Sequence, residues 1–467
     1  MSMRLGFFLL FTAIAFLRPR LTPYLIILAV PFMPKIRGGL ASTTSLEEVV
    51  ILASIAGMFC YAIFGQHVSI RKDGVFVAYL TFIFILTFTG LLHWFDSSSS
   101  QMRVDIIQYI KLLLPFLTLI VTRWAIQERS QVNRLMHLFL GVSVILAVMG
   151  LLQHYMLFNV HVLCNRFYPL WGDPSYGARF TYFREATATF DGLHVYSGIY
   201  FMICTVIAAH FYFFGSRRKL LQSFYLICTG LNLVALTMTF SRAATICVNV
   251  GLAVILLQVI LSVGKDNRYR EIALIAVLIT SIAFIFFPYV DKHRLVERFE
   301  ADSASVLVME NRGFCWKEAF RVSMYNPIVG YGFRSMSASI QFREPHNAYL
   351  QIVLVGGLIL FIPFLLLIYK IGKKLWDARH EVLIGWGLPV FLSMLAFEMS
   401  SFNLFTWDRG RVNSMIWVLF GLALSLPFQG ERDAVRVQSR ATVSVGMVDE
   451  AAFPAPEPVL ASMGYID

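Results

Sequence analysis

Long runs of uncharged apolar residues recur along this 467-residue chain and limit what it can fold into. A run of about 20 apolar residues matches the thickness of the hydrocarbon core of a bilayer. Each run ends at charged residues, Pro or Gly, which are typical of helix ends. The sequence therefore predicts an all-α polytopic membrane protein with about 12 transmembrane helices, near residues 21–33, 48–64, 74–92, 104–122, 135–157, 192–214, 220–239, 243–263, 272–288, 348–369, 382–400 and 412–427.

The composition excludes the other main classes of protein. Apolar residues make up 58% of the chain and charged residues only 14%, whereas soluble proteins are about 25% charged. A soluble enzyme, a disordered chain and a disulfide-stapled secreted domain are all excluded. The net charge of +11 is explained by Lys and Arg in cytoplasmic loops, and without basic stripes interleaved with aromatics we expect no nucleic-acid partner. The six Cys show no spacing that suits a metal site.

The charges of the short loops predict the orientation of the chain. Lys and Arg gather at Arg71-Lys72 and in the stretches 123–134, 217–219, 265–270 and 370–379. Even numbers of predicted spans separate these stretches, so all of them can lie in the cytoplasm together. The same parity places the loop 158–191, the Ser241-Arg242 turn and the segment 289–347 on the outer side. Both ends of the chain are then cytoplasmic.

Four regions follow from this arrangement. Residues 1–288 form an N-terminal transmembrane bundle, and 289–347 form an extracytoplasmic loop domain with short helices. Residues 348–428 form C-terminal transmembrane helices, and 429–467 read as a disordered cytoplasmic tail because they are polar and rich in Ala, Pro and Ser. The apolar stretch 5–17 is too short to span comfortably and predicts an interfacial or half-inserted helix; whether it crosses the membrane is left open.

The outer segment ends in Pro345-His346-Asn347, directly before an apolar span. Proline suits the first turn of a helix, so His346 and Asn347 are expected at a helix N-terminus at the outer face of the membrane. The free amides and the positive end of the helix dipole attract an anion there and disfavour imidazolium. A neutral His beside an anion site can act as a general base. The alternative is an interfacial His that only caps the helix.

Several arginines are predicted on the same side of the membrane. Arg242 begins a span after Ser241, Arg312 shares a helix face with Trp316 four residues later, and Arg184 precedes another span. Guanidinium groups suit phosphate oxygens, and a lipid-linked diphosphate is the natural anion at that depth. Such a clamp needs no metal, and we expect no metal and no cofactor. The alternative is that these arginines reach the lipid headgroups or the solvent.

The ordered motifs resemble the O-antigen ligase / polysaccharide polymerase superfamily of O-antigen ligase-related membrane proteins. They are Ser241-Arg242 at a span junction, Arg312 with Trp316, the turn Asn326-Pro327-Ile328-Val329-Gly330-Tyr331-Gly332, and Pro345-His346-Asn347 with Leu350 leading into a Gly-containing span. Residues 184–192 resemble the R-x-T-G-T-F segment of the family, with Ala188 where glycine is usual. The resemblance covers about residues 180–370.

The resemblance implies a C-type glycosyltransferase-like fold whose long periplasmic loop caps the active site. It implies transfer of a glycan from undecaprenyl diphosphate to an acceptor hydroxyl, with the site on the periplasmic side of a bacterial inner membrane. By similarity His346 is the catalytic base or positions the acceptor, and Arg242, Arg312 and Arg184 hold the diphosphate. Supporting roles fall to Asn347, Trp316 and Arg343.

Several functions stay open at this point. The leading hypothesis is an O-antigen ligase that uses lipid A–core as acceptor. A polymerase that lengthens an O-antigen or exopolysaccharide is nearly as well supported, and a protein-glycosylating ligase less so. A transporter or flippase for the lipid-linked glycan would need ionisable residues deep in the spans; the spans are mostly clean, with Asp105 and Lys111 as the main exception. No motif indicates the sugar, the acceptor or the oligomeric state.

Overall fold

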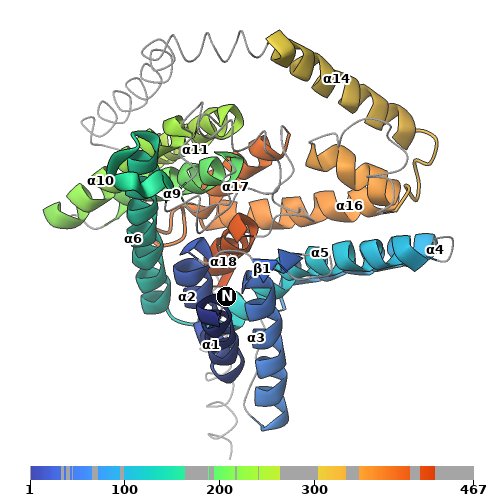
Figure 1. The fold of residues 1–467 in the computed structure, drawn as a ribbon, viewed down its shortest axis with the longest axis horizontal. Helices are drawn as coiled ribbons and strands as arrows, with labels where there is room; N and C mark the ends of the chain where they lie inside the picture. Colours follow the sequence, from blue (N-terminus) through green and yellow to red (C-terminus); the bar gives the residue numbers. More distant parts are fainter. Residues whose placement is uncertain are drawn as a thin grey trace, which may run out of the picture. The chain divides into compact units, whose positions relative to one another are not determined.

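The computed structural model describes residues 2–32, 36–37, 43–44, 46–65, 72–94, 99–162, 188, 194–215, 218–239, 241–262, 303–332, 347–399 and 411–425. Helices make up almost all of these residues (Figure 1). The two strands among them have two residues each and pair antiparallel, β1 (Ile36–Arg37) with β2 (Thr43–Thr44). The predicted boundaries at 288 and 347 border residues outside these ranges and stay predictions.

The helices follow one another along the chain with short connections. In order they are α1 (Ser2–Leu17), η1 (Pro19–Leu21), α2 (Thr22–Ala29), η2 (Val30–Phe32), α3 (Leu46–Ile63), α4 (Gly74–Trp94), α5 (Ser99–Ala125), α6 (Arg129–His154), η3 (Leu157–Asn159), α9 (His194–Phe214), α10 (Lys219–Met238), α11 (Arg242–Ser262), α14 (Ser303–Ser323), α16 (Ala348–Asp377), α17 (Gly387–Glu398) and α18 (Arg411–Ser425).

Ten of the twelve apolar segments predicted from the sequence coincide with helices to within a few residues. The segment 272–288 lies outside the described residues, and the segment 21–33 holds only the short α2 and η2. By length and composition, six described helices can cross a membrane, or seven if a bent pair counts as one span. The chain is therefore a multi-pass membrane protein, but the predicted count of about twelve spans is not confirmed.

The N-terminal stretch forms one half of that bent pair. Helix α1 ends at Leu17, and the chain turns by 114° before η1 and α2. Pro19 lies at this break, where its missing N–H and fixed φ oppose a continuous helix. Helix α1 packs against α3. The sequence prediction of a helix too short to span by itself agrees with this broken geometry.

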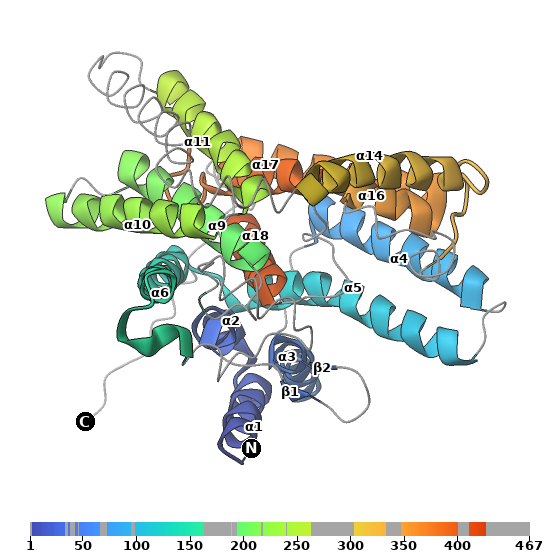
Figure 2. The same cartoon turned by 45° about the horizontal axis from the view of Figure 1, so that its top comes forward.

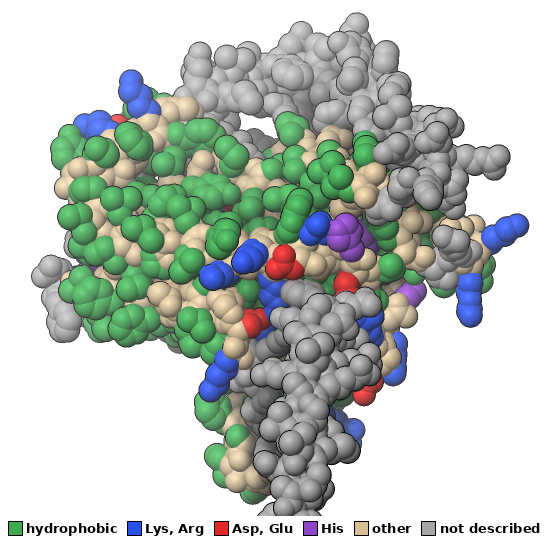
Figure 3. Space-filling view, turned by 180° about the vertical axis from the view of Figure 1, so that it is seen from behind, with side chains coloured by type: hydrophobic (Ala, Val, Ile, Leu, Met, Phe, Trp, Pro, Cys, Tyr) green, Lys and Arg blue, Asp and Glu red, His purple; other side chains and the backbone are tan. Residues whose placement is uncertain are grey.

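The exposure of apolar side chains separates lipid-facing helices from buried ones. Helix α9 contacts α6, α10 and α11, and its side chains from Ser197 to Phe211 are buried throughout. In contrast, one side of α4 exposes Val77, Leu80 and Phe84. Figure 3 shows apolar side chains covering much of one face, while charged side chains gather in one region below it. This distribution is expected where acyl chains replace water around the helices.

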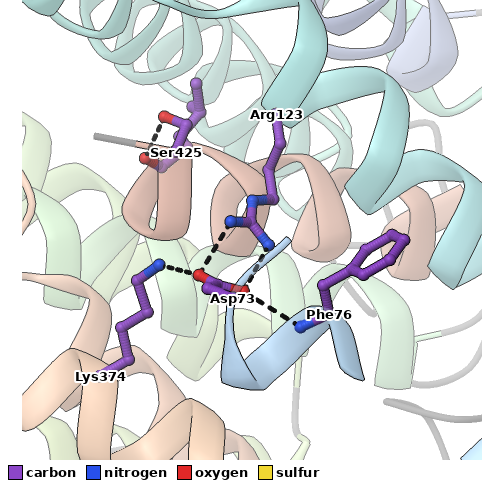
Figure 4. Close-up of polar contacts among 6 residues, drawn as sticks. Asp73, Phe76, Arg123, Lys374 and Ser425 are labelled. Carbon is purple, nitrogen blue, oxygen red and sulfur yellow. Dashed lines mark hydrogen bonds and ion pairs between the residues drawn. The ribbon is translucent and has the colours of Figure 1, made fainter. Parts of the chain in front are cut away.

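An ion triad joins the ends of three helices (Figure 4). Asp73 precedes α4 and accepts two hydrogen bonds from Arg123 of α5, at 3.1 and 2.9 Å, and a third contact comes from Lys374 of α16. Asp73 also accepts a bond from the Phe76 N–H at 3.1 Å, which caps α4. The Arg123 side chain is 1% exposed and that of Lys374 is 9% exposed. The triad therefore holds α4, α5 and α16 together at the end that the sequence places in the cytoplasm.

Candidate functional site

Helix α16 is a helical hairpin, although its length and apolar composition suit a single span. The rings of Tyr349 and Phe364 lie 6.1 Å apart, whereas 15 residues of straight helix would separate them by about 22 Å. The fold-back occurs at Gly357, whose φ of 59° and ψ of −159° are not helical. The first part, up to about Gly356, therefore runs back along the second part, which begins at about Leu358.

The turn that follows α14 fills the break in the hairpin. The N–H groups of Tyr331 and Gly332 donate to the carbonyls of Leu354 and Val355, both at 2.8 Å. In return, the N–H groups of Leu358 and Ile359 donate to the carbonyls of Pro327 and Ile328, at 2.8 and 3.2 Å. Four backbone groups that lose their helical partners are thus satisfied by another segment, as a buried or membrane environment requires. This explains the Asn-Pro-x-x-Gly-x-Gly motif.

Two glycines make the junction possible. Gly330 has a φ of +70° and Gly357 a φ of +59°, both in the region that disfavours other residues. A Cβ at Gly330 would lie 2.6 Å from the Gly357 nitrogen, and a Cβ at Gly357 would clash with the Ile328 carbonyl. The backbones of the turn and the hairpin therefore approach too closely for any side chain at these positions.

Asn347 is the residue that begins α16. Its side-chain oxygen accepts a hydrogen bond from the Leu350 N–H at 3.1 Å, and its amide donates to the Met399 carbonyl at 3.2 Å. The helix starts at Ala348, so the sequence prediction of a helix start at this motif is correct but two to three residues too early. Because the first part folds back from the tip, Asn347 lies about 10 Å below the tip and not at the end of the hydrophobic segment.

A buried carboxylate that the sequence analysis overlooked lies beside this helix start. Glu398 is the last residue of α17, is 1% exposed, and directly precedes Met399, which accepts the Asn347 bond. Its carboxylate is close enough to the Tyr349 hydroxyl to interact with it electrostatically. The signal was a single Glu within an apolar segment, since an ionisable residue in a predicted span is a candidate functional residue.

The register of α11 against α17 places the start of α11 near the same point. The Gln258 amide donates to the Gly385 carbonyl at 3.3 Å, and a Cβ at Gly251 would lie 2.5 Å from the Ser393 hydroxyl. The numbers therefore rise along α17 as they fall along α11, and the two helices are antiparallel. Continuing this register puts Arg242 about one turn, or about 5 Å, beyond Glu398. The starts of α11 and α16 thus lie at the same end of α17.

Helix α14 carries the second predicted arginine. Its buried residues Cys315, Ala319 and Val322 follow the 3–4 spacing of one helix face, and Ala319 and Val322 pack against Leu354 of α16. The spacing places position 312 on the same face, one turn before Cys315. As predicted, positions 312 and 316 belong to one helix, which is longer than expected. Figures 1 and 2 show α14 alongside α16.

One residue of the segment 184–192 is described. Ala188 is buried, and its N–H donates to the Gln153 side chain of α6 at 2.8 Å. Its φ of +47° lies in the region that favours glycine, the residue that the resemblance predicts at this position. The segment that begins with Arg184 is therefore anchored against the C-terminal end of α6.

The remaining predicted site residues are placed only in part. Arg184, Arg343 and His346 lie outside the described residues, and for Arg242 and Arg312 only the helical backbone is described. Trp316 is half-buried on α14. Their roles stay predictions. Within the described ranges, no three His, Cys, Asp or Glu side chains are grouped so that they could hold a metal ion.

Comparison with known proteins matches part of the chain to one family. Residues 227–365 match the family model described as O-Antigen ligase. A Rickettsia felis protein named "Putative polysaccharide ligase" is 27% identical over 222 residues, which cover 44% of this chain and 51% of that protein. A Rickettsia typhi protein with the same description is 27% identical over 168 residues, covering 32% and 40%. The chain thus spans about half the length, or less, of these relatives. The resemblance that the motifs indicated is confirmed.

Proposed function

Since this chain carries an O-antigen ligase-type segment at residues 227–365, we propose that it is a membrane glycosyltransferase that moves a glycan from undecaprenyl diphosphate to an acceptor hydroxyl. The favoured acceptor is lipid A–core, which makes the enzyme an O-antigen ligase of the bacterial inner membrane. The observation that carries the proposal is the convergence of the α16 start, the α11 start and Glu398 at one end of α17. The site then faces the periplasm.

The reaction requires a base for the acceptor and charge neutralisation for the leaving group. His346 takes the proton of the acceptor hydroxyl as that oxygen attacks the anomeric carbon of the donor glycan. The bond from this carbon to the diphosphate oxygen breaks, and undecaprenyl diphosphate leaves with the bonding electrons. Arg242 and Arg312 neutralise the diphosphate, with Arg184 as a third cation. This clamp of guanidinium groups makes the transfer independent of metal.

Glu398 has a place in the same scheme. Asn347 bonds to the residue next to Glu398, and His346 directly precedes Asn347 in sequence. A buried carboxylate at this position stabilises the imidazolium that forms when His346 takes a proton. It thereby raises the basicity of the histidine in a site whose helix N-terminus would otherwise lower it. Glu398 acts in this proposal as a positioning residue.

Lipopolysaccharide gels of a deletion strain test the proposal. Loss of O-antigen with intact core and accumulation of long lipid-linked glycan supports a ligase. Core that carries a single repeat indicates a polymerase instead, and glycan retained on the cytoplasmic side indicates a flippase. His346→Ala, Arg242→Ala and Arg312→Ala should each fail to restore O-antigen. The control variants His380→Ala and Arg218→Ala change exposed residues and should restore it.

The metal independence is tested with the purified enzyme, a polyprenyl-diphosphate glycan and lipid A–core. Transfer should continue after exhaustive chelation. Strict dependence on an added divalent ion would overturn the arginine clamp. Transfer to another acceptor, with none to lipid A–core, would keep the chemistry and change the acceptor class.

A further inference from the structure

Helix α14 and the turn after it expose a cluster of large apolar side chains. Phe320, Met324, Tyr325 and Ile328 are 58, 62, 72 and 59% exposed, and we refer to these four as the α14 surface. They lie outside the face of α14 that packs against α16. An apolar cluster of this kind is unfavourable in water and marks an interaction surface.

The α14 surface continues an apolar stripe on the second part of α16. Along that part Leu358, Ile362, Leu365, Leu366 and Tyr369 are exposed, at the spacing of one helix face. The stripe belongs to the segment whose length and composition suit a membrane span, so acyl chains cover it. The backbone bond from Ile359 to Ile328, at 3.2 Å, makes the two surfaces adjoin.

The length of the span gives the depth at which they adjoin. From Leu358 to Asp377 the helix has 20 residues, which corresponds to about 30 Å and to the hydrocarbon core of a bilayer. With Asp377 at one boundary of the core, Leu358 lies at the other. Ile328, beside it, therefore lies at the border between acyl chains and headgroups.

The charged neighbours of the α14 surface fit that border. The Arg321 guanidinium lies 5.9 Å from the centre of the Tyr325 ring and pairs with Glu318. Lys317 is also exposed, one turn before Arg321. Tyrosine rings and long cationic side chains are enriched at membrane interfaces, where the ring and the stem contact lipid and the charge reaches the headgroups.

We propose that the α14 surface is embedded in the lipid leaflet at the Leu358 end of the span, with Phe320, Met324 and Ile328 among the upper acyl chains. Helix α14 is then an interfacial helix and not part of a water-surrounded loop domain, as the sequence analysis expected for 289–347. Embedding fixes the height of position 312 above the bilayer. The inference depends only on the membrane and holds whichever reaction the enzyme catalyses.

Electron paramagnetic resonance with single spin labels on the full-length protein in phospholipid nanodiscs tests the proposal. Labels at positions 320, 324 and 328, in a background without native cysteines, should collide more with oxygen than with a water-soluble nickel chelate. Ile362 serves as the lipid-facing control, and Lys219, at an exposed helix end, as the water-facing control. Nickel accessibility like that at Lys219 would overturn the proposal. Spin–spin broadening at these sites would also overturn it, because it would make a second copy the occupant.

A second measurement uses the unaltered chain in case the cysteine-free background does not fold. Photoactivatable phospholipids are crosslinked to the wild-type protein, and the labelled residues are mapped by mass spectrometry. Adducts are expected on residues 320–328 as well as on 362–369. Adducts on 362–369 alone would show that lipid covers α16 but not α14, and the proposal would be wrong.

Discussion

Replacing Asp73 with Asn should destabilise the protein strongly, because it leaves two buried cations without a counter-charge. The Arg123 side chain is 1% exposed and the Lys374 side chain 9% exposed. Burial by itself raises the pKa of Asp73, but the hydrogen bonds and charges of Arg123 and Lys374 outweigh it and lower the pKa to about 2. The shift from the ordinary value of 3.8 corresponds to about 2 kcal/mol. Removing one partner of a buried ion pair costs about 3–5 kcal/mol, so we expect a loss of about 2–5 kcal/mol.

Unfolding of the purified protein in mixed micelles of mild detergent and SDS measures this loss. Lys374→Met should cost less than Asp73→Asn, because the two hydrogen bonds between Arg123 and Asp73 remain. The cost of Asp73→Asn should also be smaller in the Lys374→Met background, where only one cation is left unpaired. An exposed pair gives the matched control: Glu318→Gln should cost less than about 1 kcal/mol. Equal costs for Asp73→Asn and Glu318→Gln would refute the reasoning.

Four further outcomes follow from the contacts. Because the pKa of Asp73 is lower in the folded protein, its stabilisation is complete above about pH 4 and disappears as the pH falls toward 2; unfolding curves of wild type and Asp73→Asn should converge over that window, and a constant gap would contradict this. Gly357→Ala should destabilise by more than about 1 kcal/mol because of the clash and the positive φ, whereas Gly141→Ala, with open space around it, should not; similar unfolding of the two would be unexpected. Asn347→Ala should cost about 1 kcal/mol through the lost cap and lower glycan transfer, as measured on the purified enzyme. Glu398→Gln should keep the fold and shift the pH profile of transfer to a different optimum; an unchanged profile would remove Glu398 from the mechanism.

Local sequence pattern predicted the helices well. Apolar runs ended by charge, Pro or Gly gave ten segments that coincide with helices, because helix length in a membrane protein follows from continuous apolar composition. The motif around Asn347 predicted a helix start, and the resemblance predicted a glycine-like position at Ala188, which has the corresponding φ. These features depend on residues that are neighbours in the chain.

Long-range contacts decided the rest. An apolar run of the length of α16 reads as one span, and only the hydrogen bonds from residues 327–332 allow it to break and fold back at Gly357. The same fold-back brings Asn347 to Met399 and makes Glu398 a neighbour of the candidate site. The partners of Asp73 likewise come from helices 50 and 301 residues away.

Amino-acid sequence alone determined that this chain crosses a membrane, where its helices begin and end, and which residues are suited to diphosphate and base chemistry. Tertiary structure decided which helix ends meet and how deep the start of α16 lies. The physical reason is that helix periodicity reports local burial, whereas the satisfaction of backbone groups at a helix break depends on a segment elsewhere in the chain. In a membrane no water can replace that segment.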